Sequence, residues 1–139
     1  MTNDPLLAQL DDQQIVARTV YGEARGEGAI GQQAVLNVIF NRASSKTTWW
    51  GTTPRLVCLK PYQFSCWNKD DPNYGILTSA LYGSIFEQVL DLTKQAFAGD
   101  LPDLTGGADS YKVIGTSARW AENLKPVKLI GHHEFYRTV

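Results

Sequence analysis

Four glycines within ten residues limit what the first third of this chain can fold into. They are Gly22, Gly26, Gly28 and Gly31. Apolar residues recur with helical spacing before this cluster, over residues 11–21, and after it, over residues 31–42. Because glycine ends helices more readily than it continues them, we expect two helices joined by a turn rather than one long helix. Asp11 or Asp12 is expected to cap the first helix.

The stretch over residues 44–74 is rich in tryptophan, proline and glycine. It predicts a long, irregular and aromatic-rich insertion, with a short strand at residues 63–67. Trp49 and Trp50 in this insertion are open to two interpretations. They are either core aromatics or a platform on which sugar rings stack.

The second half of the chain predicts one more helix and a small amount of strand. Apolar spacing favours a helix from about residue 78 to residue 99, and residues 127–136 favour a short β-hairpin. We therefore expect an α+β fold, mainly helical, in a single domain over residues 1–139. Residues 1–10 form an N-terminal extension in this interpretation.

The charge balance and the aromatic content narrow the classes of function. Thirteen basic and fourteen acidic residues give a formal net charge of -1, so we expect no nucleic-acid partner. Hydrophobic residues make up 43% of the chain, which is too many for a disordered protein. The four Trp, six Tyr and five Phe include several among polar residues, proline and glycine. Flat aromatic faces beside polar groups favour a sugar or peptide ligand.

The N-terminal residues bear on where the protein is made. Residues 1–5 lack the basic start and apolar run of a secretory signal, and no stretch approaches the roughly 20 apolar residues of a membrane span. We therefore expect synthesis in a cytoplasm and no membrane insertion, and we also expect a monomer. Cys58 and Cys66 are expected to be buried thiols, with a disulfide as the alternative in an oxidising compartment.

Signatures of several other chemistries are missing. A zinc site needs three or four ligands, and the only histidines, His132 and His133, would point to opposite faces of a strand. We expect no metal and no other cofactor. A Gly-x-Ser-x-Gly elbow and a phosphate-binding Gly-x-x-x-x-Gly-Lys-Ser/Thr loop are both absent from the sequence. Apolar and aromatic neighbours of both cysteines disfavour a cysteine–histidine nucleophile.

Glu23 is the residue whose position points most directly to catalysis. It lies at the expected C-terminal end of the first helix, where the helix dipole opposes ionisation of a carboxyl group. With partial burial this raises the pKa, and a glycosidase uses such a protonated carboxylic acid to protonate the leaving oxygen. The alternative is that Glu23, Arg25 and Glu27 form an ordinary solvated surface.

The expected strand offers a second candidate surface. On a strand, Gln63, Ser65 and Trp67 share one face, and Phe64 and Cys66 share the other. The first face presents an amide, a hydroxyl and an indole to a ligand, while the second contributes to the core. The alternative is an ordinary half-buried strand.

Four segments, taken in order, form a recognisable pattern. Residues 17–28 contain Tyr-Gly-Glu-Ala-Arg-Gly-Glu-Gly, and residues 31–42 begin Gly-Gln-Gln-Ala-Val and end Asn-Arg. Residues 61–67 read Pro-Tyr-Gln-Phe-Ser-Cys-Trp, and residues 107–137 begin Gly-Ala and close on Phe-Tyr-Arg. This pattern resembles the cell-wall hydrolase family that includes the spore-cortex-lytic enzymes, and it covers residues 13–137.

The resemblance implies a lysozyme-like fold that acts on peptidoglycan glycan strands. Family members are described as lytic transglycosylases or muramidase-like hydrolases that cut between N-acetylmuramic acid and N-acetylglucosamine. The resemblance implies that Glu23 is the catalytic acid. The expected substrate-binding residues are Gln63, Ser65, Trp67, Tyr111 and Glu27. The sequence departs from the pattern before Tyr111, where relatives often carry a histidine and this chain has Asp-Ser.

A catalytic domain without a signal resembles a bacteriophage endolysin or a prophage relative, made in the host cytoplasm and acting on the wall. Glu27 meets Glu23 only if the helix continues through Gly26, which the glycines disfavour. We therefore expect a lytic transglycosylase that uses one carboxylate. Hydrolysis with a water positioned by Ser65 is the first alternative, and a catalytically silent glycan-binding or phage structural module is the second.

Overall fold

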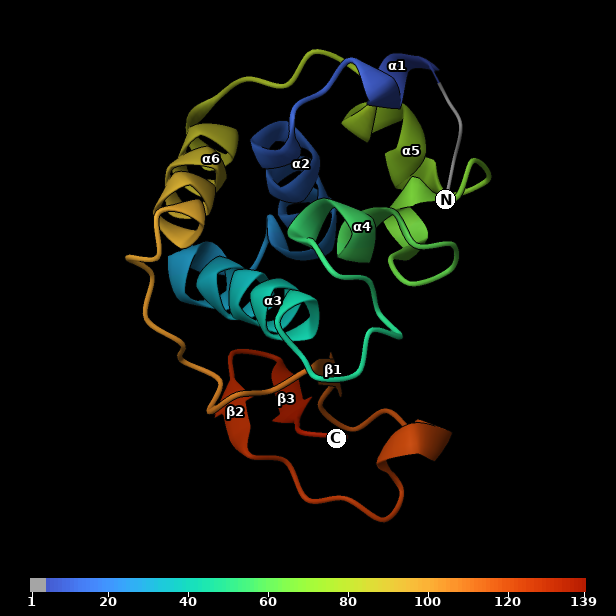
Figure 1. Cartoon of the computed structure of the whole chain (residues 1–139), viewed down its shortest axis with the longest axis vertical. Coiled ribbons are helices and arrows are strands. Elements are labelled where there is room, and N and C mark those ends of the chain that lie inside the picture. Colours follow the sequence, from blue (N-terminus) through green and yellow to red (C-terminus); the bar gives the residue numbers. More distant parts are fainter. Residues whose placement is uncertain (1–4) are drawn as a thin grey trace.

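The computed structural model describes residues 5–139 and places a group of helices beside a small sheet (Figure 1). The α-helices are α1 (Pro5–Ala8), α2 (Asp12–Ala24), α3 (Gly28–Ala43), α4 (Pro54–Leu59), α5 (Pro72–Leu77) and α6 (Ser84–Phe97). Two 3₁₀ helices are η1 (Ser65–Trp67) and η2 (Arg119–Ala121), and the strands are β1 (Ser110–Val113), β2 (Lys128–Ile130) and β3 (His133–Tyr136). The expected mainly helical α+β fold is confirmed.

Helix α2 is the centre of the helical part, because α3, α4, α5 and α6 all contact it. Its fully buried residues are Ile15, Val16, Ala17, Thr19 and Val20. The helix begins as the sequence predicts, since the Asp11 side chain accepts a hydrogen bond from the backbone N–H of Gln14 at 2.8 Å. Burial on so many sides makes α2 a rigid support for whatever its C-terminal end carries.

The glycine cluster separates α2 from α3, as the sequence predicts. Helix α2 ends at Ala24, where the backbone N–H of Arg25 still bonds to the Tyr21 carbonyl oxygen. Helix α3 begins at Gly28, three residues earlier than expected. Gly28 has a φ of 75°, which a residue with a side chain adopts only under strain. The chain therefore turns sharply within residues 25–28.

The expectation of a strand at residues 63–67 is wrong, while most of the stretch over residues 44–74 consists of turns and bends. Two short helices that were not predicted, α4 and the start of α5, interrupt it, and each starts with a polar cap followed by proline. Thr53 accepts a hydrogen bond from Leu56 N, and Asp71 accepts one from Asn73 N. Proline suits the first helical turn because its missing N–H would be unpaired there. The expected strand is replaced by η1, a 3₁₀ turn.

Helix α6 starts later than the spacing of apolar residues predicts. Its first residue is Ser84, and the preceding Gly83 has a φ of 102°. Leu81 therefore lies in the connection before the helix rather than on its apolar stripe. Phe86, Val89 and Thr93 form the buried side of α6, which packs against α2 and α3.

The sheet is antiparallel in the order β1-β3-β2. The expected hairpin is confirmed as β2 and β3, while β1 was not predicted. Tyr111 lies opposite Phe135, and both side chains share the face that covers Ala34 and Val38 of α3. The other face carries Lys112 and Glu134, which form an ion pair of 2.9 Å. The sheet thus brings Tyr111 against the helices.

The N-terminal extension is only partly described, because residues 1–4 lie outside the described part of the chain. Within it, the α1 residue Leu7 is 2% exposed, so it belongs to the core. Cys58 and Cys66 are free, buried thiols, and burial raises the pKa of Cys58 to about 12. Across residues 5–139 no helix is both long and apolar enough to cross a membrane.

Candidate active site

Gly22 lets the last turn of α2 pack closely against η1 and α5. A Cβ atom at this position would lie 3.0 Å from Leu77 Cδ1 and 3.1 Å from Cys66 Cβ. A larger residue would therefore push both elements away. Glu23 is the next residue and stands one position before the end of the helix. The predicted place of Glu23 at the C-terminal end of a helix is confirmed, and the contacts of Gly22 fix it there.

The Glu23 carboxyl group is half-buried and accepts a hydrogen bond from the Tyr111 hydroxyl, with Oη 3.0 Å from Oε1. Burial raises the pKa of Glu23 above its ordinary value, and the negative charge of Asp71 adds to this rise. The Tyr111 hydrogen bond and the charge of Arg42 oppose it. Burial is thus the leading cause of a pKa shift whose direction the sequence predicts.

Tyr111 is held rigidly as the partner of Glu23. Its ring stands edge-on to His133, with centroids 5.3 Å apart, and lies 5.5 Å from the ring of Phe135. Burial raises the pKa of Tyr111 well above its ordinary value, so its hydroxyl stays protonated and donates to Glu23.

Arg42 brings a positive charge to the same region. Its guanidinium group lies 5.7 Å from the Trp50 ring centroid and 5.4 Å from that of Phe64, and its Nε donates to the carbonyl oxygen of Asp109. Nη1 is buried and has no hydrogen-bond partner within residues 5–139. Arg42 ends one of the recognised segments, but its place in the site was not predicted, because only the fold brings the end of α3 beside the start of β1.

Glu27 occupies a different environment from Glu23. Its Oε2 lies 3.1 Å from Nδ1 of His132, and its Oε1 lies 3.1 Å from Nδ1 of His133. The hydrogen bond with His132 lowers the pKa of Glu27 below its ordinary value. Only 16% of the Glu27 side chain is exposed. Glu27 is therefore engaged by the β2–β3 hairpin rather than placed beside Glu23.

The expectation that the two histidines point to opposite faces of a strand is wrong. Strand β3 begins at His133, whereas His132 lies in the two-residue turn after β2. Gly131 takes the first turn position with a φ of 57°, a backbone conformation that tight hairpin turns require. This turn allows both imidazoles to reach Glu27. No group of three metal-binding side chains suited to a metal ion occurs among the residues described.

The expected common face of Gln63, Ser65 and Trp67 does not form. Ser65 is exposed, while Trp67 is 6% exposed and donates from its indole Nε1 to Thr19 Oγ1 at 2.8 Å. The 3₁₀ turn rotates successive side chains by about a third of a turn instead of alternating them. Gln63 is half-buried and donates from Nε2 to the Val57 carbonyl oxygen.

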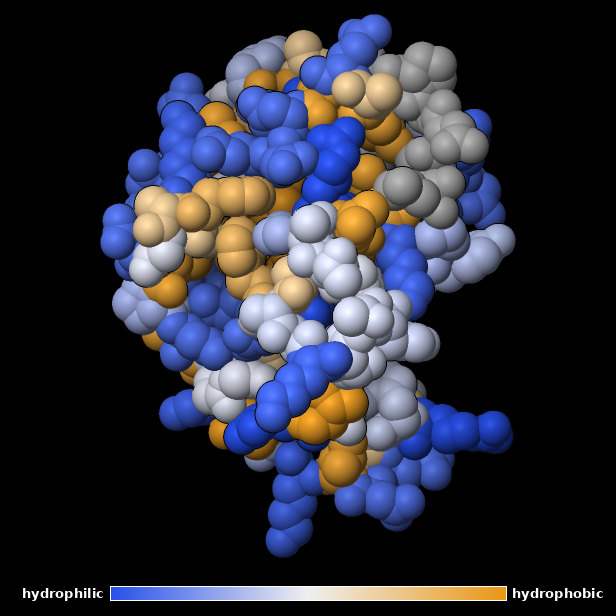
Figure 2. Space-filling view, in the orientation of Figure 1, coloured by the Kyte–Doolittle hydropathy of each residue, from blue (hydrophilic) through white to orange (hydrophobic). Residues whose placement is uncertain are grey.

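Two neighbouring hollows open at the surface around Tyr62. One, of about 410 Å³, has Tyr111, Arg42 and Gln63 among its lining residues and lies between the helical part and the loop that carries η2. The outline of the molecule is hollowed at that place, at the right of Figure 2. The other hollow, of about 480 Å³, is lined by residues 59–62, 64 and 67–70. Tyr62 lines both.

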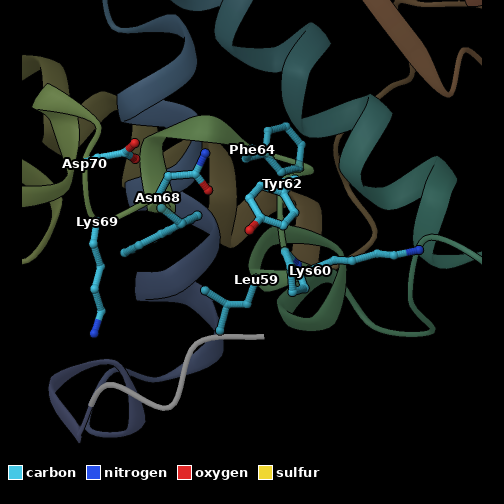
Figure 3. A pocket seen from close by; sticks show the side chains of 9 residues that line it. Leu59, Lys60, Tyr62, Phe64, Asn68, Lys69 and Asp70 are labelled. Atoms are coloured by element: carbon cyan, nitrogen blue, oxygen red, sulfur yellow. The ribbon is translucent and has the colours of Figure 1, made fainter.

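Figure 3 shows the second hollow from close by. The rings of Tyr62 and Phe64 lie next to each other, while the side chains of Lys60 and Lys69 extend away from them in different directions. Lys60 reaches the carbonyl oxygen of Trp49 and lies over its ring, 4.0 Å from the centroid. Trp49 is 64% exposed and Trp50 is 5% exposed, so one of the two tryptophans is a core residue and the other is not.

Three residues of this region are not among the site residues predicted from the sequence: Arg42, Asp71 and Trp120. Trp120 is 43% exposed and lines the first hollow. Asp71 was overlooked as a neighbour of Glu23 because the two are far apart in sequence. Its signal was the Asp-Pro pair that starts α5, which identifies a helix cap but not what the cap lies beside.

The Glu23 carboxyl group, the Tyr111 hydroxyl and the hollow that Tyr111 lines thus lie together at the C-terminal end of α2. The family model described as Cell Wall Hydrolase matches residues 26–136. The chain belongs to this family. Glu23 lies just before the matched residues, so its assignment rests on its surroundings.

Curated relatives of this chain include spore cortex-lytic enzymes. It is 32% identical over 135 residues to a spore cortex-lytic enzyme of Halalkalibacterium halodurans, covering 96% of this chain and 37% of that protein. It is 31% identical over 137 residues to a spore cortex-lytic enzyme of Bacillus cereus, covering 96% of this chain and 47% of that protein. The chain therefore spans less than half the length of these curated relatives.

Two solved structures share the fold. The catalytic domain of the Bacillus cereus SleB protein superimposes with a TM-score of 0.69 at 31% identity, covering 91% of this chain and 89% of that one. The catalytic domain of the germination-specific lytic transglycosylase SleB from Bacillus anthracis gives a TM-score of 0.71 at 28% identity, covering 99% of this chain and 100% of that one. This protein is thus similar to SleB catalytic domains over nearly all of its length.

Proposed function

We propose that this protein cleaves the β-1,4 bond between N-acetylmuramic acid and N-acetylglucosamine in peptidoglycan, with Glu23 as the catalytic acid. The observation that carries the proposal is the environment of the Glu23 carboxyl group. Its carboxyl group is half-buried, its pKa is raised, and it adjoins a hollow through Tyr111. A carboxylic acid that stays protonated towards neutral pH can donate to a glycosidic oxygen.

The reaction we favour is lytic transglycosylation. Glu23 gives its proton to the glycosidic oxygen as the bond from that oxygen to C1 of the muramoyl residue breaks, which leaves an oxocarbenium-like sugar. The Glu23 carboxylate then takes the proton of the C6 hydroxyl while the C6 oxygen bonds to C1. The product is a 1,6-anhydro-muramoyl end. The name of the Bacillus anthracis relative, a lytic transglycosylase, supports this choice.

One carboxylate is enough for that sequence of steps. Glu27, the acidic residue nearest to Glu23 in the sequence, is engaged by His132 and His133, so it is poorly placed to act as a second catalytic group. Tyr111 is suited to steady the Glu23 carboxylate after the first proton transfer, because its hydroxyl already donates to Oε1. The site therefore supports a cycle in which one group serves first as acid and then as base.

Mass spectrometry of peptidoglycan fragments tests the reaction type. Digestion of purified peptidoglycan should release fragments with anhydro-muramoyl ends, which are 18 mass units lighter than fragments with reducing ends because no water is added. Fragments with only reducing ends would contradict transglycosylation and show hydrolysis. Binding of glycan without release of any fragment would instead indicate a catalytically silent glycan-binding module.

Hydrolysis is the second candidate, and Asp71 is the observation in its favour. Its negative charge acts on Glu23, so a carboxylate other than Glu27 lies within electrostatic range. Hydrolysing glycosidases pair two carboxyl groups across the scissile bond. If this candidate is correct, Asp71→Asn will abolish release of reducing ends. If transglycosylation is correct, Asp71→Asn will keep anhydro ends and only alter the pH profile.

A further inference from the structure

The hollow beside Tyr111 has exposed aromatic rings on both of its sides. Tyr62 comes from the helical part of the molecule, after α4, and Trp120 comes from η2 in the loop between β1 and β2. Both line the hollow that also contains Tyr111, the partner of Glu23. Neither ring serves the core, because Tyr62 is 88% exposed and Trp120 is 43% exposed. Their place in the hollow calls for a different explanation.

Tyr62 is held outward by an unfavourable backbone conformation. Its φ of 63° is the only positive value at a non-glycine residue in the described chain. The left-handed region disfavours residues with a Cβ atom, and such strain gathers at sites that clamp ligands. Tyr62 also borders the second hollow, where its ring lies next to Phe64 (Figure 3). The Tyr62 ring therefore lies at the boundary between the two hollows.

Trp120 is positioned in advance of any ligand. Its ring stands edge-on against Tyr136 of β3, with centroids 5.2 Å apart and an angle of 89° between the planes. Tyr136 in turn donates a hydrogen bond to Glu134 at 2.8 Å. Contacts on one side fix the indole, while nearly half of its surface stays open. A rigid aromatic group of this kind binds a ligand at low cost in conformational entropy.

We propose that Tyr62 and Trp120 form a binding subsite for one pyranose ring of the glycan strand, next to the bond that Glu23 cleaves. The proposal rests on the proposed function, since it assumes that the strand passes Glu23. The C–H faces of a pyranose pack on aromatic rings, and its hydroxyl and acetamido groups need hydrogen bonds at the edges. Gln63 supplies one such group, because its Nε2 is used by the Val57 carbonyl while its amide oxygen still accepts.

Nuclear magnetic resonance on the inert Glu23→Gln protein gives a direct test of contact. The chain has four tryptophans, and Trp120→Phe identifies which indole N–H signal belongs to Trp120. Titration with soluble N-acetylglucosamine–N-acetylmuramic acid oligosaccharides should move the Trp120 signal. The Trp67 signal should stay in place, because that indole is buried and bonded to Thr19. A Trp120 signal that does not move at saturation would overturn the proposal.

Kinetics on peptidoglycan suspensions separate binding from chemistry. Trp120→Ala and Tyr62→Ala should each raise the half-saturating substrate concentration about tenfold and change kcat much less, since tenfold corresponds to about 1.4 kcal/mol of binding. Trp120→Phe should recover most of the loss. Tyr82→Ala is the matched control, because Tyr82 is 85% exposed and belongs to neither hollow.

The outcomes distinguish this proposal from the proposed function. Unchanged half-saturation in both alanine variants, with Glu23→Gln inactive, would overturn the subsite alone. A fully active Glu23→Gln protein would overturn the catalytic assignment instead. Melting temperatures of all variants guard against misfolding, and the conservative Trp120→Phe variant keeps the contact with Tyr136 where alanine removes it. Self-association that weakens in Trp120→Ala without any effect of glycan on Trp120 would show a contact between copies and contradict the sugar subsite.

Discussion

Glu23 and Glu27 stand four residues apart in one short motif and are surrounded in opposite ways. Glu23 ends a buried helix, accepts one hydrogen bond from Tyr111 and has a raised pKa caused mainly by burial. Glu27 follows that helix, contacts His132 and His133, and has a lowered pKa caused mainly by its hydrogen bond with His132. The first carboxyl group is kept ready to hold a proton, and the second is kept charged.

This contrast separates a chemical role from a structural one. A buried carboxyl group with a raised pKa can exchange its proton with a ligand, whereas one that contacts two imidazoles holds its neighbours in place. Glu27 joins the turn after α2 to the β2–β3 hairpin. His133 also packs against Tyr111, so Glu27 supports the sheet that presents Tyr111 to Glu23.

The largest expected effect is the difference in lytic activity between Glu23→Gln and Glu27→Gln. Glu23→Gln removes the group that gives the first proton and takes the second in the proposed mechanism, so lysis of peptidoglycan should fall about 10³-fold. Glu27→Gln removes no reacting group, so lysis should fall by less than about fivefold. Turbidity loss of a peptidoglycan suspension measures both. Equal losses in the two variants would show that the environments do not divide the roles in this way.

The next effect tests the Tyr111 contact with Glu23. Tyr111→Phe removes the hydroxyl that lowers the pKa of Glu23, so that pKa should rise further and the alkaline limb of the rate profile should move to higher pH. The maximum rate should fall about tenfold, because the carboxyl group loses the hydrogen bond from the Tyr111 hydroxyl. Rate measurements across pH check both parts.

Tyr136→Phe is the matched control for Tyr111→Phe. It also removes a phenol hydroxyl from the sheet, but that hydroxyl donates to Glu134 rather than to Glu23. Its alkaline limb should stay where the wild type has it. A shift of the same size in both variants would mean that the sheet as a whole, and not the Tyr111 hydroxyl, sets the behaviour of Glu23.

Local signals in the sequence predicted helices α2, α3 and α6 and the position of Glu23 at the end of α2. Asp11 as a cap and the glycines after Tyr21 act within a few residues, so the backbone pattern alone carries the information. The hairpin of β2 and β3 was predicted for the same reason. Caps at Thr53 and Asp71 were also present in the sequence, and they mark the two helices that the irregular interpretation overlooked.

The partners of Glu23 could not be predicted in this way, because they come from distant parts of the chain. Tyr111 lies 88 positions from Glu23, and Arg42 reaches the site from the end of α3. The resemblance to a family named Tyr111, whereas nothing in the sequence pointed to its hydrogen bond. Trp120 was not predicted as a residue of the hollow, because an aromatic residue between polar neighbours has the same sequence pattern in a core and at the edge of a binding site.

The free energy of unfolding tests the structural role of Glu27. Glu27→Gln should lower the free energy of unfolding at neutral pH by about 1 kcal/mol, as the hydrogen bond and the ion-pair contact weaken. The pKa of Glu27 is lowered in the folded state, so its contribution is present above the unfolded pKa and is lost as pH falls through the folded pKa. Urea unfolding measured from pH 7 downward should show a difference that is full at pH 7 and shrinks as Glu27 becomes protonated in the folded state.

The measurement in acid is itself the control, because wild type and variant both carry an uncharged group at position 27 once the pH lies below the folded pKa of Glu27. A destabilisation that persists unchanged there would mean that packing, and not charge, holds Glu27 to the hairpin. Combining His133→Ala with Glu27→Gln should cost less than the sum of the two separate losses, because both changes delete the contact between Glu27 and His133.

The smallest expected effect is a gain in stability at Glu23, with the opposite dependence on pH. The pKa of Glu23 is raised in the folded state, so its favourable contribution is complete below the unfolded pKa and is lost as pH rises through the folded pKa. Glutamine is neutral at every pH. Glu23→Gln should therefore melt about 1–3 °C above the wild type at pH 8 and with no such gain at pH 4. A gain of the same size at both pH values would mean that burial of the charge does not cause it, and the contrast with Glu27 would then rest on activity alone.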